Sequence, residues 1–396
     1  MSRPARWPPA GLAAAEPGHR VLLAVIAAAA AATVVGLFVL WPSGGGTGLA
    51  RFLGPPADLL DAQVQAVDVQ PCAGTVAADD VRCVALTVEL DSGPDRGTSV
   101  VIENSQGGGA PTIETGDRIV VGFTPESPPG AQYYVADFQR RTPLVVLAVL
   151  FVVAVVALAR LRGVRALVGL GVSLGVLLAF VLPAILEGRR PVAVAVVGAA
   201  AILLVNLYLA HGVNLQTSTA VVGTLASLAL IGVLAAVFVA ASSFSGLASE
   251  EASFLQAASS TINLQGLLLG GIVIGSLGVL DDVTVTQASA VWELHQANPA
   301  LGARDLYRSA LRIGRDHIAS TVNTLVLAYA GASLPLLILL VEANQPVGDV
   351  LTGEVIAVEV VRTLVGSIGL VAAVPITTAL AAVVAAGRRT ANTAVA

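Results

Sequence analysis

The sequence has no lysine and few charged residues of any kind. Its 396 residues carry 21 Lys+Arg, all of them arginine, and 26 Asp+Glu, so 12% of the chain is charged and the formal net charge is -5. An average soluble domain has about 25% charged residues. The low charge argues against a soluble globular protein, and the acidic balance leaves no basic surface that could bind nucleic acid.

Cysteine is also scarce, because Cys72 and Cys83 are the only two in the chain. Two thiols are too few for a four-thiolate metal site or a disulfide scaffold. The sequence has no Walker loop, HExxH motif or nucleophile elbow with a plausible partner. We therefore expect no enzyme and no cofactor, while metal binding stays open. The histidines do not cluster in sequence: His19, His211, His295 and His317.

Long apolar runs are abundant instead, with 56% hydrophobic residues and a mean hydropathy of +0.83. A transmembrane helix needs about 20 mostly apolar residues. Eight long apolar runs with few charges are candidates, at roughly residues 21–40, 144–159, 166–186, 192–210, 219–241, 266–290, 318–341 and 360–385. The sequence predicts an all-α polytopic membrane protein with about eight transmembrane helices, the lipid bilayer being its first partner. Methionine occurs once, and the abundance of Ala, Val, Leu and Gly is typical of a GC-rich bacterial source.

The arginines predict the orientation of these helices. With the N-terminus in the cytoplasm, most of the arginines between spans lie on the cytoplasmic side, as the positive-inside rule requires. The exception is Arg189 and Arg190, expected in a short outer loop beside Glu187. The expected organisation is a cytoplasmic N-terminus (1–20), a first helix (21–41), an extracytoplasmic domain (42–142), a seven-helix bundle (143–386) and a cytoplasmic tail (387–396).

The extracytoplasmic segment 42–142 holds most of the charge and many of the glycines and prolines. Five stretches in it alternate in polarity or are rich in β-branched residues: 63–69, 81–90, 98–103, 117–123 and 132–138. They predict a small β domain inserted after the first helix, either an OB-like barrel or an open sandwich. Cys72 and Cys83 fall in this domain, where they either form a disulfide or are two small buried residues. Residues 242–263, between the fifth and sixth spans, form either an interfacial helix or a polar loop.

Two adjacent carboxylates, Asp281 and Asp282, interrupt the sixth apolar run. A charged group inside a bilayer costs several kcal/mol, so it is usually protonated, paired or exposed to a wet cavity. Function is therefore the first hypothesis for this pair, and Thr284 and Gln287 continue the polar character along the same helix. The alternative is that the helix ends near residue 280 and the Asp pair caps the next element.

The seventh run also carries polar residues. Asp316, Asn323 and Thr324 share one helical face, which could meet the Asp pair across a hairpin. His317 lies at the cytoplasmic start of this run. In the last run Glu359 is three residues before Arg362, a spacing that allows an ion pair.

Three runs of sequence resemble the YibE/F family of bacterial membrane proteins. They are GSLGVLDDVTVTQAS at 275–289, IGRDHIASTVNTLVLAYAGASLPLL at 313–337 and VRTLVGSIGLVAAVPITT at 361–378. The resemblance extends from the extracytoplasmic domain to the last helix. It implies a multi-pass plasma-membrane protein whose biochemical activity is not established.

A more distant resemblance links GVLDDVTV and HIASTVNTLVLAYAG to a helix pair in the Sec export-motor subunits, which belong with the proton-driven RND proteins. It implies that Asp282 occupies the acidic position and that Asn323 and Thr324 lie on the polar helix. This chain departs from those proteins by its eight expected helices and its much smaller outer domain. The link is an analogy at the level of fold.

These observations favour an ion- or proton-coupled transporter or permease that uses an intramembrane Asp pair. Its predicted coupling site is Asp281, Asp282, Thr284 and Gln287. A non-transporting membrane factor, whose outer β domain binds a partner, is the alternative. An intramembrane enzyme is the third hypothesis, but the sequence offers no second acid pair or nucleophile for it. We expect a location in the bacterial plasma membrane with both termini cytoplasmic. The transported ion or small molecule is not indicated, and a homo-oligomer is compatible with the sequence.

Overall fold

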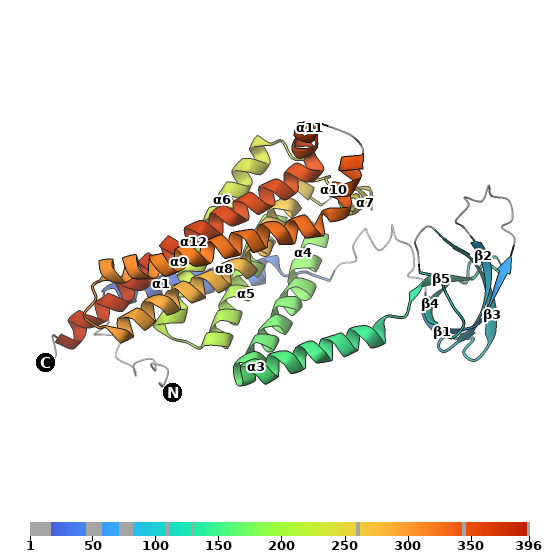
Figure 1. Cartoon of the computed structure of the whole chain (residues 1–396), viewed down its shortest axis with the longest axis horizontal. Coiled ribbons are helices and arrows are strands. Elements are labelled where there is room, and N and C mark those ends of the chain that lie inside the picture. Colours follow the sequence, from blue (N-terminus) through green and yellow to red (C-terminus); the bar gives the residue numbers. More distant parts are fainter. Residues whose placement is uncertain are drawn as a thin grey trace. The chain divides into compact units, whose positions relative to one another are not determined.

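The chain forms two compact units in a computed structural model that describes residues 17–44, 58–70, 82–107, 111–128, 130–258, 262–342 and 346–393. The helical unit consists of Met1–Phe52 and Ala159–Ala396. The sheet unit consists of Leu53–Leu158 and contains all five strands and the start of a long helix. Each unit has a hydrophobic core of its own. Figure 1 labels the helices and the five strands along the chain.

The sheet unit is built on five antiparallel strands in the order β3-β2-β1-β4-β5. Buried and exposed side chains broadly alternate along the strands, as expected for a sheet with one covered face. Leu86, Ile102 and Ile119 are among the fully buried core residues. The strands are β1 (Asp58–Gln70), β2 (Arg82–Leu90), β3 (Ser99–Gln106), β4 (Arg118–Phe123) and β5 (Tyr133–Phe138).

All five predicted strands are confirmed, and the sheet is curled, since its edge strands β3 and β5 contact each other. Tyr133 of β5 donates its hydroxyl to the carboxylate of Asp95 in the turn after β2. Burial, together with Asp95, raises the pKa of Tyr133 to about 12. Cys83 lies on β2 opposite Ser105, and the part of the chain that the structure describes has no free cysteine. Cys72 lies outside the described residues, so the bridge stays a prediction.

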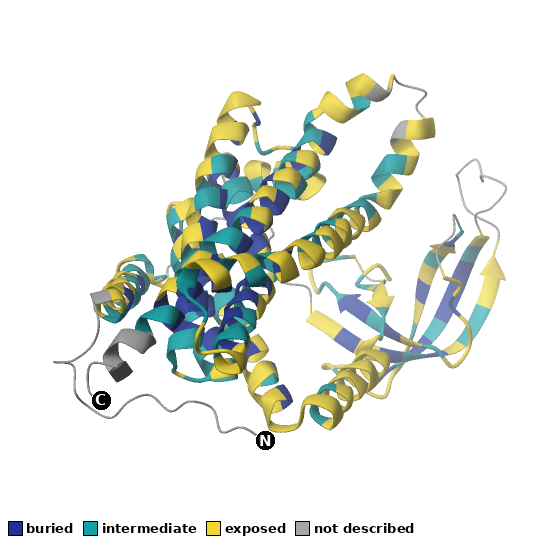
Figure 2. Ribbon diagram, turned by 60° about the vertical axis from the view of Figure 1, so that its left-hand side comes forward, coloured by how far each residue is buried: buried dark blue, intermediate teal, exposed yellow. Residues whose placement is uncertain are grey.

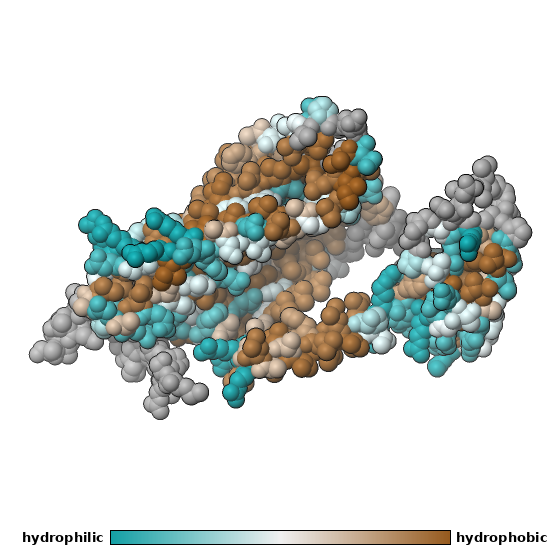
Figure 3. All heavy atoms as spheres, in the orientation of Figure 1, coloured by the Kyte–Doolittle hydropathy of each residue, from teal (hydrophilic) through white to brown (hydrophobic). Residues whose placement is uncertain are grey.

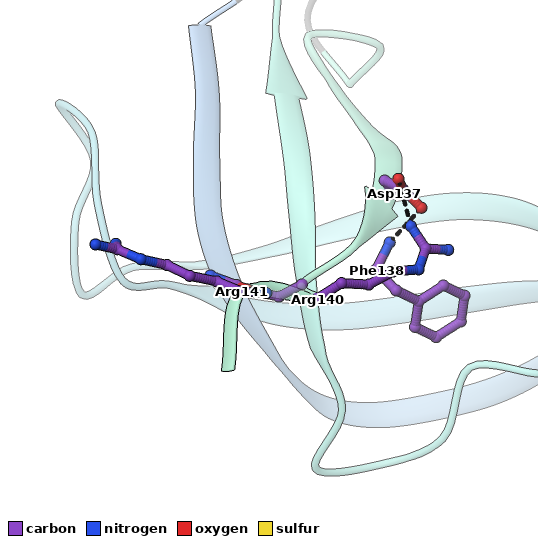
Figure 4. Close-up of polar contacts among 5 residues, drawn as sticks. Asp137, Phe138, Arg140 and Arg141 are labelled. Atoms are coloured by element: carbon purple, nitrogen blue, oxygen red, sulfur yellow. Dashed lines mark hydrogen bonds and ion pairs between the residues drawn. The ribbon is translucent and has the colours of Figure 1, made fainter. Parts of the chain in front are cut away.

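The chain leaves the sheet through a short polar segment before α3 (Arg141–Val176). The guanidinium of Arg140 and the backbone N–H of Phe138 both donate to the carboxylate of Asp137, at 2.6 and 2.8 Å. These contacts, that of Arg140 above all, hold the pKa of Asp137 below its usual range. The side chain of Arg141 points away from the cluster (Figure 4). Local charge pairing therefore fixes the segment that leads from β5 into the helix.

The helical unit has α6, α8 and α12 at its centre, each packed against the other two. Asparagines define two of the helix starts: Asn214 accepts the N–H of Thr217 before α6, and Asn263 accepts that of Gly266 before α8. The helices are α1 (Pro17–Leu40), the later part of α3, the π-helix η2 (Leu177–Val181), α4 (Leu182–Leu186), α5 (Pro191–His211), α6 (Leu215–Ala241), α7 (Glu250–Ala258), α8 (Leu264–Ala297), α9 (Ala303–Ala332), α10 (Leu334–Glu342), α11 (Val347–Thr352) and α12 (Glu354–Thr393).

Many large apolar side chains of this unit face outward. Buried residues follow the inner faces of the central helices, whereas exposed residues cover the outer faces (Figure 2). Leu178, Val237 and Val383 are exposed at 65, 56 and 60% although they are hydrophobic. Hydrophobic residues cover much of the outer surface, and hydrophilic ones gather at the end that carries the C-terminus (Figure 3). Helices that are apolar on both faces are typical of membrane-spanning bundles.

Six helical segments among the described residues are long and apolar enough to cross a membrane. They are Gly18–Leu40, Arg141–Leu186, Pro191–His211, Leu215–Ala241, Leu264–Ala297 and Glu354–Gly387. The protein is therefore a multi-pass membrane protein, as the sequence predicts. The count of eight spans is not confirmed.

The difference in count has two sources. The predicted runs 144–159 and 166–186 lie in one segment of 46 residues, which at about 1.5 Å per residue would be far longer than a bilayer. Its backbone is non-helical at Arg160, with φ 52° and ψ -129°, so this single residue divides two lengths of helix where the sequence predicts a loop. The predicted run 318–341 begins inside α9 and ends in α10, with an interruption at Ser333.

The turn between α4 and α5 contains Glu187, predicted to lie beside Arg189 and Arg190. Its carboxylate accepts hydrogen bonds from the backbone N–H groups of Ser43 and Gly44, at 2.7 and 2.8 Å, and from the Ser43 hydroxyl, and the charge of Arg189 acts on it as well. The Ser43 N–H is the main cause of a pKa of Glu187 below the usual value. Glu187 therefore ties the segment after α1 to the end of α4.

Candidate functional site

Asp281 and Asp282 line a cavity of about 380 Å³ between α3, α5 and α8. Asp282 is exposed, whereas Asp281 is half-buried, and its Oδ1 is buried with no hydrogen-bond partner among the described residues. The other lining residues are Arg165, Ala166, Gly169, Asn206, Leu207, Ala210, His211, Val285 and Thr286. The cavity thus brings two carboxylates together with an arginine, a histidine and an asparagine.

The Asp pair lies within a continuous helix. α8 runs for 34 residues through both aspartates, so the alternative that the helix ends near residue 280 is wrong. The Thr286 hydroxyl donates to the backbone carbonyl of Asp282, at 2.6 Å. Because the two side chains are neighbours on one helix, they point about 100° apart.

Polar groups from two other helices complete the cavity wall. The Asn206 amide of α5 donates to the Ser173 hydroxyl of α3 at 2.8 Å, while its own Oδ1 is buried without a partner among the described residues. Gly169 lets this amide approach, since an ideal Cβ there would lie 3.0 Å from Oδ1. A buried acceptor without a donor costs roughly 1–3 kcal/mol, which favours a donor such as water in this cavity.

The cavity lies near one end of the bundle. Leu207, Ala210 and His211 belong to the last two turns of α5, and Arg165 lies five residues after the kink at Arg160. α8 continues well beyond the aspartates to Ala297. The carboxylates are therefore level with the end of a membrane-length helix, at the side that the arginines predict to be cytoplasmic.

Thr284 faces away from the cavity, into the centre of the bundle. It is fully buried, and its hydroxyl lies 2.7 Å from that of Thr224 on α6. Each hydroxyl also lies near a carbonyl of its own helix, that of Asp281 for Thr284 and that of Ala220 for Thr224. The pair joins α6 to α8 through a hydrogen bond in an apolar environment.

Gln287 is also fully buried and faces α12 and α9. Its Oε1 lies 2.9 Å from the hydroxyl of Thr378, which itself lies 2.6 Å from the carbonyl oxygen of Val374. A hydroxyl has one hydrogen, so Thr378 donates to one of these oxygens only. The Nε2 of Gln287 is buried without a hydrogen-bond partner among the described residues. If Thr378 donates to Val374, the Gln287 amide turned by 180° would instead donate from Nε2 to the Thr378 hydroxyl. Gly314 of α9 makes room for this amide, since an ideal Cβ there would lie 2.7 Å from Nε2.

The remaining predicted site residues do not line the cavity. Asp316, His317, Asn323 and Thr324 are exposed on α9, and Thr324 bonds back to the carbonyl of Ser320. Among the described residues, this face of α9 therefore does not line the cavity of the Asp pair, contrary to the prediction. α8 instead meets α9 through the side that carries Gln287.

Glu359 and Arg362 form the ion pair that their spacing predicts. Arg362 donates to Glu359 at 2.7 Å, and both side chains are 27% exposed. The Nε of Arg362 is buried without a hydrogen-bond partner among the described residues. The pair neutralises two charges within the length of α12 that is apolar enough to span a membrane.

Sequence reasoning missed three residues of the site. Arg165 is one of the arginines between predicted spans and serves there only to orient the helices, and His211 has no predicted role. Both line the cavity with the Asp pair. Asn206 could have been found, because it is a lone amide in the apolar stretch AILLVNLYLA of α5. No group of three or more His, Cys, Asp or Glu side chains that could hold a metal ion occurs among the described residues.

The helices and the half-buried charged groups define this protein as a multi-pass membrane protein with a polar cavity inside its helical unit. The family model of the YibE/F-like proteins matches residues 147–387, more than half of the chain. The chain therefore belongs to the YibE/F-like protein family, and the family recognised in the sequence is confirmed. No curated protein and no solved structure matches the chain.

Proposed function

We propose that this protein is an ion- or proton-coupled transporter in which Asp281 and Asp282 take up and release the coupling ion. The observation that carries the proposal is the cavity that both carboxylates line, close to Arg165 and His211. Carboxylates placed among membrane helices are costly unless they serve an ion pathway or pair with other charges. The proposal involves no enzymatic step and no cofactor.

The position of the cavity suggests a role for each carboxylate. Asp282 is exposed and meets the ion first, whereas Asp281 is half-buried and holds it inside the helical unit. Arg165 balances one negative charge when the site is empty, and His211 is another polar group beside the pair. A rearrangement of α3 or α5 against α8 would then change access to Asp281, as alternating access requires.

Thr284 and Gln287 have a different role in this proposal. Both are fully buried in contacts with neighbouring helices, so they cannot meet an ion in the cavity directly. They join α8 to α6 and α12, and thereby couple a movement of the Asp pair to the rest of the bundle. The exposed residues of α9 and the Glu359–Arg362 pair stand outside the pathway.

The proposed setting is the bacterial plasma membrane, with eight spans and both termini in the cytoplasm. The arginines near the cavity end of the bundle support this orientation. The kink at Arg160 supports counting the two lengths of helix on either side of it as separate spans. The curled sheet is proposed to be an OB-like barrel, and its strand order with β3 contacting β5 supports that assignment.

A non-transporting membrane factor is the second candidate. The sheet unit is a compact body with its own core, which suits a domain that binds a partner while the helices anchor it. In that case the Asp pair is dispensable. The two candidates therefore predict opposite results for the same variants.

The test is ion flux through the purified full-length chain in liposomes that enclose a pH-sensitive dye. Sodium, potassium, magnesium, manganese and zinc ions are each added outside, with and without an imposed pH gradient. For at least one ion we expect a protein-dependent dye signal that falls at least about tenfold in Asp281→Asn and Asp282→Asn. Glu293→Gln is the matched control, because Glu293 is an exposed carboxylate on α8 that does not line the cavity.

Two results would count against transport. A signal that is the same in the two carboxamide variants as in the wild type would remove the Asp pair from the mechanism. The absence of any protein-dependent signal with every ion and gradient would favour the non-transporting factor.

A further inference from the structure

A second and larger groove lies at the opposite end of α5 from the Asp pair. Its volume is about 730 Å³, within the range of roughly 300–1,000 Å³ found for ligand sites. Most of its wall is apolar, and polar groups lie at one end only. The lining residues are Arg190, Pro191, Val192, Ala193, Val196, Val197, Asn263 and Gly266.

The polar end is formed by the starts of two helices. α5 begins at Pro191 and α8 begins at Leu264, and the two helices pack side by side. Gly266 allows this, since an ideal Cβ there would lie 3.3 Å from Cδ of Pro191. The N-terminal ends of both helices therefore bring partial positive charge and unpaired backbone N–H groups to the same place.

These N–H groups are differently used in the two helices. Asn263 caps α8 by accepting the N–H of Gly266 at 2.9 Å, which leaves its Nδ2 as a donor. No side chain caps α5 in the part of the chain that the structure describes. Val192 and Ala193, which carry the first N–H groups of α5, line the groove. N–H groups at the start of a helix are suited to bind an anion.

Arg190 adds a full positive charge to the polar end. It is exposed, and the two ion pairs found among the described residues involve other arginines. The nearest carboxylate in sequence, Glu187, accepts hydrogen bonds from Ser43 and Gly44 instead. Arg190 is thus a cation without a carboxylate partner among the described residues, beside two helix starts.

The apolar wall leads away from this cation along α5. Val192 and Val196 are 38 and 47% exposed although they are hydrophobic. From Pro191 to Val197 the helix rises by about 9 Å, so the wall reaches well below the headgroup level of a bilayer. An occupant must therefore be anionic at one end and apolar over the rest of its length.

We propose that this groove binds one anionic phospholipid, whose phosphate lies at Arg190, Asn263 and the start of α5 and whose acyl chain lies against Val192 and Val196. The site explains why an arginine occupies an end of the bundle that the positive-inside rule leaves without positive charge. It is separate from the Asp281–Asp282 cavity and does not depend on the proposed transport.

The test measures lipid binding to the purified full-length chain by native mass spectrometry. Phosphatidylglycerol and phosphatidylcholine with identical acyl chains are titrated in detergent, and inorganic phosphate is added in a parallel series. We expect the wild type to prefer phosphatidylglycerol, and inorganic phosphate to leave the lipid bound because it lacks the acyl chain. An arginine near a membrane surface contributes about 1 kcal/mol, so Arg190→Gln should weaken phosphatidylglycerol binding about fivefold.

Two further variants separate the headgroup contact from the groove. Val196→Trp fills the apolar wall and should weaken both lipids. Arg189→Gln removes the neighbouring charge, which does not line the groove, and should bind as the wild type does. The proposal is overturned if Arg190→Gln keeps the full preference, if Arg189→Gln loses it equally, if Val196→Trp binds both lipids normally, or if inorganic phosphate displaces the lipid.

Discussion

Gly314 is the point where α9 approaches the buried amide of Gln287, so Gly314→Ala tests the packing that joins α8, α9 and α12. An ideal Cβ at this glycine would lie 2.6 Å from Cγ1 of Val374, 2.7 Å from Nε2 of Gln287 and 2.8 Å from its Oε1. Side-chain carbons do not approach other heavy atoms so closely in a packed interior. Val374 and Gln287 are both fully buried, so neither has free space to move into.

Three contributions set the size of the effect. Overpacking a well-packed core costs about 1–3 kcal/mol. Displacing the Gln287 amide from the Thr378 hydroxyl costs about 1 kcal/mol more. Alanine in place of glycine inside a helix stabilises the folded state by about 1 kcal/mol. We therefore expect Gly314→Ala to lower the free energy of unfolding by about 1–3 kcal/mol.

The measurement is thermal unfolding of the full-length protein in mild detergent, followed by far-UV circular dichroism. Gly331→Ala is the matched control on the same helix, because an ideal Cβ there meets no atom within 4 Å. That variant should keep or raise the stability by up to about 1 kcal/mol. Equal shifts in the two variants, or a Gly314→Ala protein as stable as the wild type, would refute the packing described for Gln287.

Two more predictions concern polar contacts of the helical unit. In a double-mutant cycle, Thr224→Val and Thr284→Val should show a coupling of about 0.6 kcal/mol in detergent unfolding, and additive effects would contradict the hydrogen bond between them. The pKa of Glu187 is lowered in the folded protein, so its bonds to Ser43 and Gly44 stabilise the fold above the unfolded value of about 4.3 and are lost as pH falls through the folded value. Glu187→Gln should remove this loss from a series of unfolding midpoints across acid pH, and an unchanged pH profile would contradict it.

The helices and strands were predictable where the sequence carries one clear pattern, either alternating polarity or a long apolar run. The alternation of 81–90 and 117–123 predicts strands that the structure contains as β2 and β4. The apolar runs likewise predict helices, because about 20 apolar residues need a membrane or a core. The ends of the helices are less predictable. Arg160 looks like part of a loop, yet a single non-helical residue is enough to turn the chain.

The site was predictable only in part, for a geometric reason. Asp281 and Asp282 are visible in the sequence because charges interrupt an apolar run. Their neighbours come from α3 and α5, and a helix pattern does not tell which of several apolar helices packs against which face. The sequence therefore assigns the α9 face to the Asp pair, whereas Arg165 and His211 line the cavity in its place.

The most direct test of the central claim is rescue of a strain that lacks this protein. The strain is grown across a range of pH values, metal ions and ionophores to find a condition in which the wild-type gene restores growth. Our account predicts that Asp281→Asn and Asp282→Asn fail to restore growth at normal membrane abundance, whereas Glu293→Gln succeeds. Full rescue by both carboxamide variants would contradict a coupling role for the Asp pair and would point to the sheet unit as the functional part.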